Sequence, residues 1–210
     1  YLGAISGGLD NIRGMARIGD TVYLTNSGTA NGAPGPAIVR FDTEGNNLGS
    51  FSTGGTSPSP FGILAYGDGM LVSSSSANDD IHHFSLDGTS LGTFHNSTAL
   101  NFAEQMIVAS NGDILVAGFS SNNIVRLDAE SGAVITTYSA NGARGLYELG
   151  NGNLLWTNGT GVHVMDLETG GSTLVYAGGG RYLDFLLVPA PGFASLLGVA
   201  GLFGAARRRR

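Results

Sequence analysis

The sequence predicts an all-β protein, a β-propeller of four-stranded blades, followed by a short hydrophobic C-terminal helix. Three observations predict this fold. A unit of about 40 residues recurs four times, glycine supplies 35 of the 210 residues, and Asn-Gly or Asp-Gly pairs separate short apolar segments. Four strands in a unit of this length are typical of propeller blades. Glycine after Asn or Asp favours the tight turns of β-hairpins.

The clearest repeated element is an apolar strand that ends near an aspartate. It reads IVRFD at 38–42, IHHFS at 81–85, IVRLD at 124–128 and VHVMD at 162–166. Another strand follows each copy, at 48–51, 91–94, 134–138 and 173–176. One more precedes each copy, at 22–24, 70–72, 114–116 and 154–156. An innermost strand completes each unit, around Met15, Ile63, Met106 and Leu146.

These repeats define the domain organisation. Helical repeats have a similar period, but no segment before the C-terminal tail has apolar residues at helical spacing. We assign residues 1–187 to the propeller, with blades near 11–55, 56–98, 99–141 and 142–180 and partial strands at 1–8 and 181–187. The partial strands match an outermost and an innermost strand. We therefore expect an N-terminally truncated larger ring, and a four-bladed ring is the alternative.

The body of the chain is acidic. All ten basic residues are arginines, and four of them form the terminal run 207–210. The other six arginines stand against 16 acidic residues, a balance that the phosphates of nucleic acid repel. Nucleic acid is therefore excluded as a partner. Cysteine is absent, which excludes disulfides, cysteine nucleophiles and thiolate metal sites.

The chain changes character from Val188. Two prolines precede a stretch without charge at 193–206, and arginines end the chain. This stretch is shorter than the roughly 20 residues that cross a bilayer as a helix, and the arginines favour a cytoplasmic end. A buried or amphipathic helix is the alternative, but the stretch has no polar face apart from Ser195.

This tail, residues 188–210, resembles the PEP-CTERM sorting signal, in which a Pro-Glu-Pro-like motif, a short transmembrane segment and an arginine cluster end an exported protein. Ala190 stands where the family usually has Glu. The residues that match the prolines and the cluster are Pro189, Pro191, Arg207, Arg208, Arg209 and Arg210. The resemblance implies export, recognition by an exosortase-type membrane protease, membrane attachment through the tail, and a place in the cell envelope or an extracellular matrix.

The sequence predicts no catalytic residue, metal or cofactor. His82 and His163 align with strand residues of sister blades, and His83 points to the opposite face from His82, whereas zinc needs three or four converging ligands. The acidic loop at 78–80 lacks the alternating ligands of a calcium loop. Aspartates before glycine turns favour turn capping, and they recur as Asp42, Asp128 and Asp166.

One repeated position carries a candidate binding site. Near the start of each innermost strand, successive units carry Arg13, Phe61, Glu104, Arg144 and Arg181. Innermost strands line the channel of a propeller, so the three arginines are expected to converge at one mouth. Guanidinium groups bind carboxylates with two hydrogen bonds. We predict that the three arginines and Glu104 bind an acidic polysaccharide or an envelope protein. The alternative is that each arginine pairs with a neighbouring acid or carbonyl.

The predicted function is therefore that of a binding or scaffold module. The alternative is a propeller enzyme of the lyase or lactonase type, with a channel-centred active site and Glu104 as the candidate base. A histidine or two further carboxylates beside Glu104 would favour the enzyme. The fold does not decide between them, because propellers host both functions.

Overall fold

The computed structural model describes residues 7–76 and 80–185, and their regular secondary structure is almost entirely β strand. They form 16 strands and one 3-10 turn, η1 (Ala30–Gly32). The strands make four antiparallel sheets of four, and in every sheet they pair in sequence order. The predicted all-β propeller of four-stranded blades is confirmed.

The strand bounds follow the repeat in the sequence. The first blade contains β1 (Ile12–Ile18), β2 (Thr21–Asn26), β3 (Ala37–Asp42) and β4 (Asn47–Ser52). The second contains β5 (Pro60–Tyr66), β6 (Gly69–Ser74), β7 (Ile81–Ser85) and β8 (Ser90–His95). The third contains β9 (Ala103–Val108), β10 (Ile114–Gly118), β11 (Asn123–Leu127) and β12 (Val134–Ser139). The fourth contains β13 (Leu146–Glu148), β14 (Leu154–Thr157), β15 (Gly161–Met165) and β16 (Ser172–Ala177).

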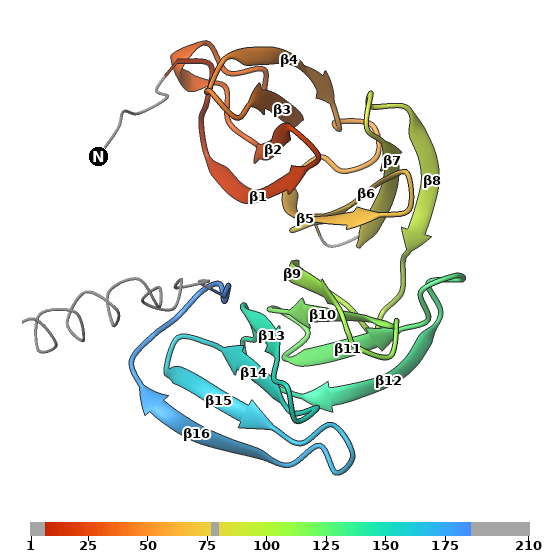
Figure 1. The fold of residues 1–210 in the computed structure, drawn as a ribbon, viewed down its shortest axis with the longest axis vertical. Coiled ribbons are helices and arrows are strands. Elements are labelled where there is room, and N and C mark those ends of the chain that lie inside the picture. The colour runs from red at the N-terminus through yellow and green to blue at the C-terminus, as the bar shows by residue number, and fades with distance from the viewer. Residues whose placement is uncertain (1–6, 77–79, 186–210) are drawn as a thin grey trace, which may run out of the picture.

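The four blades follow one another in an arc (Figure 1). Strands β1, β5, β9 and β13 lie toward the middle of the arc, and β4, β8, β12 and β16 lie on its outside. The arc is open between the first and fourth blades, on the side where the chain returns toward the middle after β16. Each blade therefore presents one end of its innermost strand to a shared central region.

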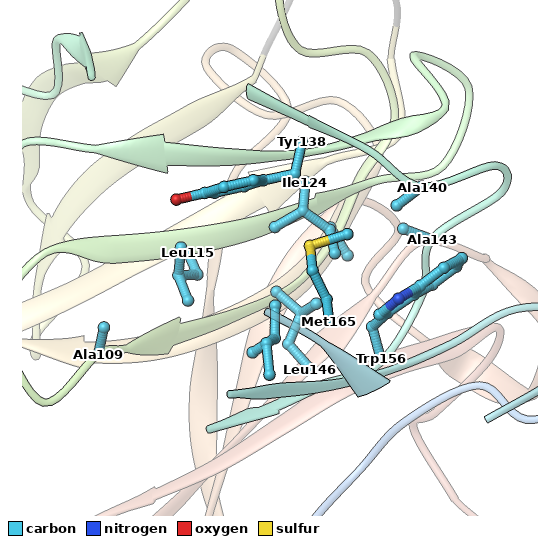
Figure 2. Close-up of a cluster of buried hydrophobic side chains, with 11 residues drawn as sticks. Ala109, Leu115, Ile124, Tyr138, Ala140, Ala143, Leu146, Trp156 and Met165 are labelled. Carbon is cyan, nitrogen blue, oxygen red and sulfur yellow. The ribbon is translucent and has the colours of Figure 1, made fainter. Parts of the chain in front are cut away.

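Apolar side chains between neighbouring blades form the core. Figure 2 shows the cluster between the third and fourth blades, where Leu115 and Ile124 meet Leu146, Trp156 and Met165. Full burial of one such side chain contributes about 1.5–3 kcal/mol. Strands that are apolar on both faces, such as β6 and β10, are explained by this packing, because both faces of a middle blade contact a neighbour.

Aspartate side chains cap the turn after the third strand in three blades. In the first blade, the Asp42 carboxylate accepts hydrogen bonds from the side chain and backbone of Asn46 and from the backbone of Glu44, and these bonds lower its pKa. Hydrogen bonds from Ser131 and Glu130 lower the pKa of Asp128 in the same way. The third member, Asp166, caps its turn with the backbone of Thr169 and Glu168. These aspartates stabilise the turns, as the sequence pattern predicted.

Several predictions lie outside the described residues. They are the outermost strand near the start of the chain, residues 78 and 79 of the acidic loop, and the whole tail with Pro189, Pro191 and the arginines at 207–210. Within the described ranges, the structure contains no helix of sufficient length and apolar character to cross a membrane.

Candidate functional site

A hydrogen-bond arrangement that joins an innermost strand to the next innermost segment recurs three times. The backbone N–H of Gly14 donates to Thr25 Oγ1 at 2.7 Å, and this hydroxyl donates to the backbone oxygen of Phe61 at 2.8 Å. We call this set of an N–H, a hydroxyl and the next carbonyl the hydroxyl clasp. It recurs in Gly62, Ser73 and Glu104 and in Gly145, Thr157 and Arg181.

Glycine is required in this arrangement because the next innermost segment approaches so closely. A Cβ atom at Gly14 would lie 2.1 Å from the backbone oxygen of Phe61, and one at Gly62 would lie 2.3 Å from that of Glu104. Residues after the fourth blade take the same place, since the carbonyl of Arg181 accepts from Thr157 at 3.0 Å. The backbone of Arg181 therefore lies beside the fourth blade as an innermost strand would.

The junction between the third and fourth blades departs from the clasp. Gln105 replaces the glycine and Ala117 stands at the hydroxyl position of β10. The backbone N–H of Gln105 donates directly to the carbonyl of Arg144 at 3.3 Å. Its side-chain oxygen accepts from the N–H groups of Leu146 at 3.0 Å and Leu183 at 3.1 Å, and its amide nitrogen donates to the carbonyl of Leu183 at 2.8 Å. One glutamine thus connects three innermost segments.

The same junction contains a buried ion pair. The carboxylate of Glu104, whose side chain is 0% exposed, accepts a hydrogen bond from Arg144 Nη1 at 2.9 Å. Burial raises the pKa of Glu104, and the positive charges of Arg144, Arg181 and Arg13 oppose the rise. Its other oxygen, Oε2, has no hydrogen-bond partner among the described residues. Glu104 is therefore a desolvated carboxyl group whose pKa is raised by burial, and nearby arginines partly offset this rise.

Aromatic rings lie against the guanidinium groups of Arg144 and Arg13. The Arg144 guanidinium lies 4.0 Å from the ring centre of Phe119, and the Arg13 guanidinium lies 5.3 Å from that of Phe61. The ring of Phe102 joins the other two, with centroid distances of 5.2 Å to each. Cation–π contacts of this kind contribute about 0.5–2 kcal/mol and restrict the orientation of the guanidinium. The sequence interpretation missed Phe102 and Phe119.

The three predicted arginines therefore differ in their availability. Arg144 is occupied by Glu104, whereas Arg13 is half-buried and Arg181 is exposed. Arg13 Nε donates to Asn11 Oδ1 at 2.7 Å. Burial raises the pKa of Tyr182 to about 12, the charge of Glu104 adds to the rise, and all three arginines oppose it. Three positive charges and one negative charge thus surround one end of the innermost strands.

The histidines lie in other structural contexts. His95 is buried, with Nδ1 bonded to the carbonyl of Gly132 at 2.7 Å and Nε2 to Ser97 Oγ at 2.9 Å. The ring of His163 stacks on Trp156 at a centroid distance of 4.1 Å. In the part of the chain that the structure describes, no three His, Asp or Glu side chains gather as a metal site. The hydrogen bond that the structure gives Glu104 comes from an arginine rather than a histidine.

A cavity of about 510 Å³ lies in the central region, next to these groups. Residues of β1, β5 and β9 and the segment 182–184 line it. Arg13 and Tyr182 belong to this lining, and Gln105 contributes from β9. Of the three predicted arginines, Arg13 lines this cavity.

Comparisons with known proteins agree on the fold. No protein-family model matches the chain, and no curated protein matches it by sequence. Virginiamycin B lyase from Staphylococcus aureus is structurally similar, with a TM-score of 0.57, 15% identity, and coverage of 86% of this chain and 56% of the lyase. A protein of unknown function from Bacteroides caccae has a TM-score of 0.61, 17% identity, and coverage of 84% and 69%.

A third similar structure is the extracellular domain of a protein described as a one-component system from B. thetaiotaomicron. Its TM-score is 0.57 at 18% identity, and the match covers 78% of this chain and 22% of that one. The likeness is one of fold. The chain spans just over half the length of the lyase that it matches. These structures therefore support a propeller module, and its ligand has to be argued from the local geometry.

Proposed function

We propose that this chain is a propeller binding module that recognises a carboxylate-bearing ligand at the mouth of its central channel. The observation that carries the proposal is the charge arrangement around Glu104. Arg144 neutralises this buried carboxylate, and Arg13 and Arg181 add two further positive charges nearby. In a protein with a net charge of −6, such a concentration of guanidinium groups favours an anion.

The three arginines have different roles in this proposal. Arg144 has its carboxylate partner and its aromatic neighbour, so its role in the proposal is to hold the site in place. Arg13 and Arg181 are the residues proposed to contact the ligand. A guanidinium presents five N–H donors in a planar fork that matches a carboxylate, and the Nε donor of Arg13 bonds to Asn11 Oδ1 at 2.7 Å.

The enzyme alternative is less well supported by this geometry. A channel base needs a free carboxylate beside a histidine, a metal or a second acid. Glu104 is instead paired with Arg144 and fully buried. One similar structure is a lyase, but at 15% identity it carries no residue roles to this chain.

The cellular part of the proposal is that the module is exported and processed or anchored through the PEP-CTERM-like tail. The motif residues and the acidic body support it, and one similar structure, seen twice, is an extracellular domain of this fold. Expression of the full chain and of a chain lacking residues 188–210, in a host with an exosortase, tests it. We expect envelope association of the full chain only. Equal distribution of both chains would overturn the proposal.

Binding is tested by titration calorimetry at low salt with two carboxylates, trigalacturonate and octanoate. Loss of one charged hydrogen bond costs about 1.5–3 kcal/mol, so Arg13→Gln and Arg181→Gln should each weaken binding about tenfold or more. Arg17→Gln is the matched control, because Arg17 lies on the same strand and bonds to Asp20 and Gly19. Absence of binding by both carboxylates, or equal binding by all variants, would overturn the proposal.

A further inference from the structure

The wall of the central cavity is mainly apolar. Met15 is 70% exposed and Ile12 is 43% exposed, although both line this concave surface. The other apolar lining residues are Leu24, Ile63, Met106 and Leu183. Apolar side chains that remain exposed in a concave site are typical of ligand-binding pockets, and methionine adapts its shape to irregular ligands.

The polar groups of the lining are mostly occupied. The Gln105 amide bonds to the backbones of Leu146 and Leu183, and Asp184 Oδ1 accepts from the N–H of Phe185 at 2.7 Å. Arg13 is the charged lining residue that offers donors to an anion. The cavity therefore provides a cationic anchor and an apolar wall, with few further groups for the many hydroxyls of a sugar.

The cavity is also electrically asymmetric. Arg181 aligns with Arg13 in the repeat, and Asp184 follows three residues later. Three residues of extended chain correspond to about 10 Å. An anion near Asp184 would be repelled, whereas an anion at Arg13 and Arg181 would be attracted. The charged end of a ligand is therefore expected at Arg13, and its uncharged part should extend toward Met15 and Ile63.

We infer that the central cavity binds an amphiphilic carboxylate, with its carboxylate on Arg13 and its apolar body against Met15, Ile63 and Met106. This inference rests on the proposed function and names the ligand class for the same site. The alternative class, an acidic sugar, shares the carboxylate but offers hydroxyl groups where the wall is apolar. The two classes are separated by the dependence of affinity on apolar chain length.

The experiment compares hexanoate, octanoate, octanamide and trigalacturonate on the full chain by titration calorimetry. Each buried CH₂ contributes about 0.8 kcal/mol, or about fourfold in affinity, so octanoate, with two more CH₂ groups, should bind about fifteenfold more tightly than hexanoate. Octanamide lacks the charge and should bind about tenfold more weakly than octanoate. Trigalacturonate should bind more weakly than octanoate.

Two pairs of variants locate the site. Met15→Ser should weaken octanoate binding about fivefold by loss of apolar contact, and Leu48→Ser, an exposed apolar residue on β4, should leave it unchanged. Arg13→Gln should weaken octanoate binding, and Arg17→Gln should not. Affinity independent of chain length, or unaffected by Met15→Ser, overturns the inference. If the inference fails in this way but trigalacturonate binding still depends on Arg13, the proposed function stands. If octanoate and trigalacturonate both bind independently of Arg13, the proposed function itself is overturned.

Discussion

The second and third blades are joined differently from the third and fourth. At the first of these junctions, Gly62, Ser73 and the carbonyl of Glu104 form an uncharged hydroxyl clasp. At the second, Gln105 and the Glu104–Arg144 pair take over. The clasp is small and local, and it requires glycine. The other solution places an uncharged glutamine side chain where the clasp has glycine, beside a buried ion pair. The repeated rule is thus broken beside the candidate site, since Gln105 also lines the central cavity, and such departures are common at functional positions.

The largest expected effect comes from breaking the charged junction. Arg144→Ala leaves the buried Glu104 carboxylate without its partner, which should lower the free energy of unfolding by about 3–5 kcal/mol at neutral pH. Arg126→Ala is the control, because Arg126 pairs with the partly exposed Asp113 and should cost about 1 kcal/mol or less. Urea denaturation of both variants measures the difference. Equal losses of stability would contradict a special role for the junction between the third and fourth blades.

This effect should depend on pH in a defined direction. Because the pKa of Glu104 is raised in the folded state, the folded protein takes up a proton at a pH where the unfolded chain does not. The free energy of unfolding therefore increases as the pH falls through the pKa that Glu104 has in the folded protein. Arg144→Ala removes the main opposing charge, so its deficit should shrink on acidification. Glu104→Gln should remove this dependence of stability on pH. A stability loss of Arg144→Ala that is the same at every pH would refute the role given to the Glu104 carboxyl group.

The next effect comes from closing the space that the clasp requires. Gly62→Ala places a Cβ atom 2.3 Å from the backbone oxygen of Glu104, so the strands must separate. Overpacking of this kind costs about 1–3 kcal/mol. Gly150→Ala, at a position with no heavy atom within 4 Å, should be close to neutral. A melting temperature for Gly62→Ala that matches the control would show that the junction adapts.

A smaller effect is expected when the clasp hydroxyl is removed. Ser73→Ala leaves the N–H of Gly62 and the carbonyl of Glu104 without this shared partner, at a cost of about 1–2 kcal/mol. The control is Ser139→Ala on the exposed edge of β12, which should change stability little. Chemical denaturation distinguishes them, and an unaltered Ser73→Ala would mean that the backbone groups find other partners.

The smallest effect tests whether one junction can be converted into the other. Gln105→Gly combined with Ala117→Ser installs the clasp between the third and fourth blades. A double-mutant cycle should give a favourable coupling of about 0.5–1.5 kcal/mol between the two changes. Strictly additive effects would show that glycine and hydroxyl do not act together at this junction.

The sequence predicted the blades because their signals are local. The alternation around Ile38 or Ile124 and the Asn-Gly turns specify strands and hairpins within a few residues. Partnerships across blades leave no such signal. The pairing of Glu104 with Arg144 joins residues 40 positions apart. The comparison of the repeats placed both in one class of channel residue, and only the alternative interpretation, an arginine paired with a neighbouring acid, anticipated this contact.

A weaker signal for the clasp was present in the sequence. Glycine follows the channel position in three units, at Gly14, Gly62 and Gly145, and a Ser or Thr recurs on the second strand. The sequence prediction used only the channel residue that precedes this glycine. The roles of Arg13 and Arg181 toward a ligand stay predictions, because the structure places the side chains and only binding measurements can assign them a partner.

The hydroxyl clasp has a consequence for how such a protein can diversify. Its acceptor is a main-chain oxygen, which every amino acid possesses, and the residues that supply it here are Phe61, Glu104 and Arg181. The side chain at that position therefore takes no part in the hydrogen bond that joins the blades. Replacing an aromatic ring with a carboxylate or a guanidinium there leaves this hydrogen bond intact, and the cost of the change is set by how deeply the new side chain is buried. New specificities can evolve at the channel mouth, one blade at a time, on an unchanged frame.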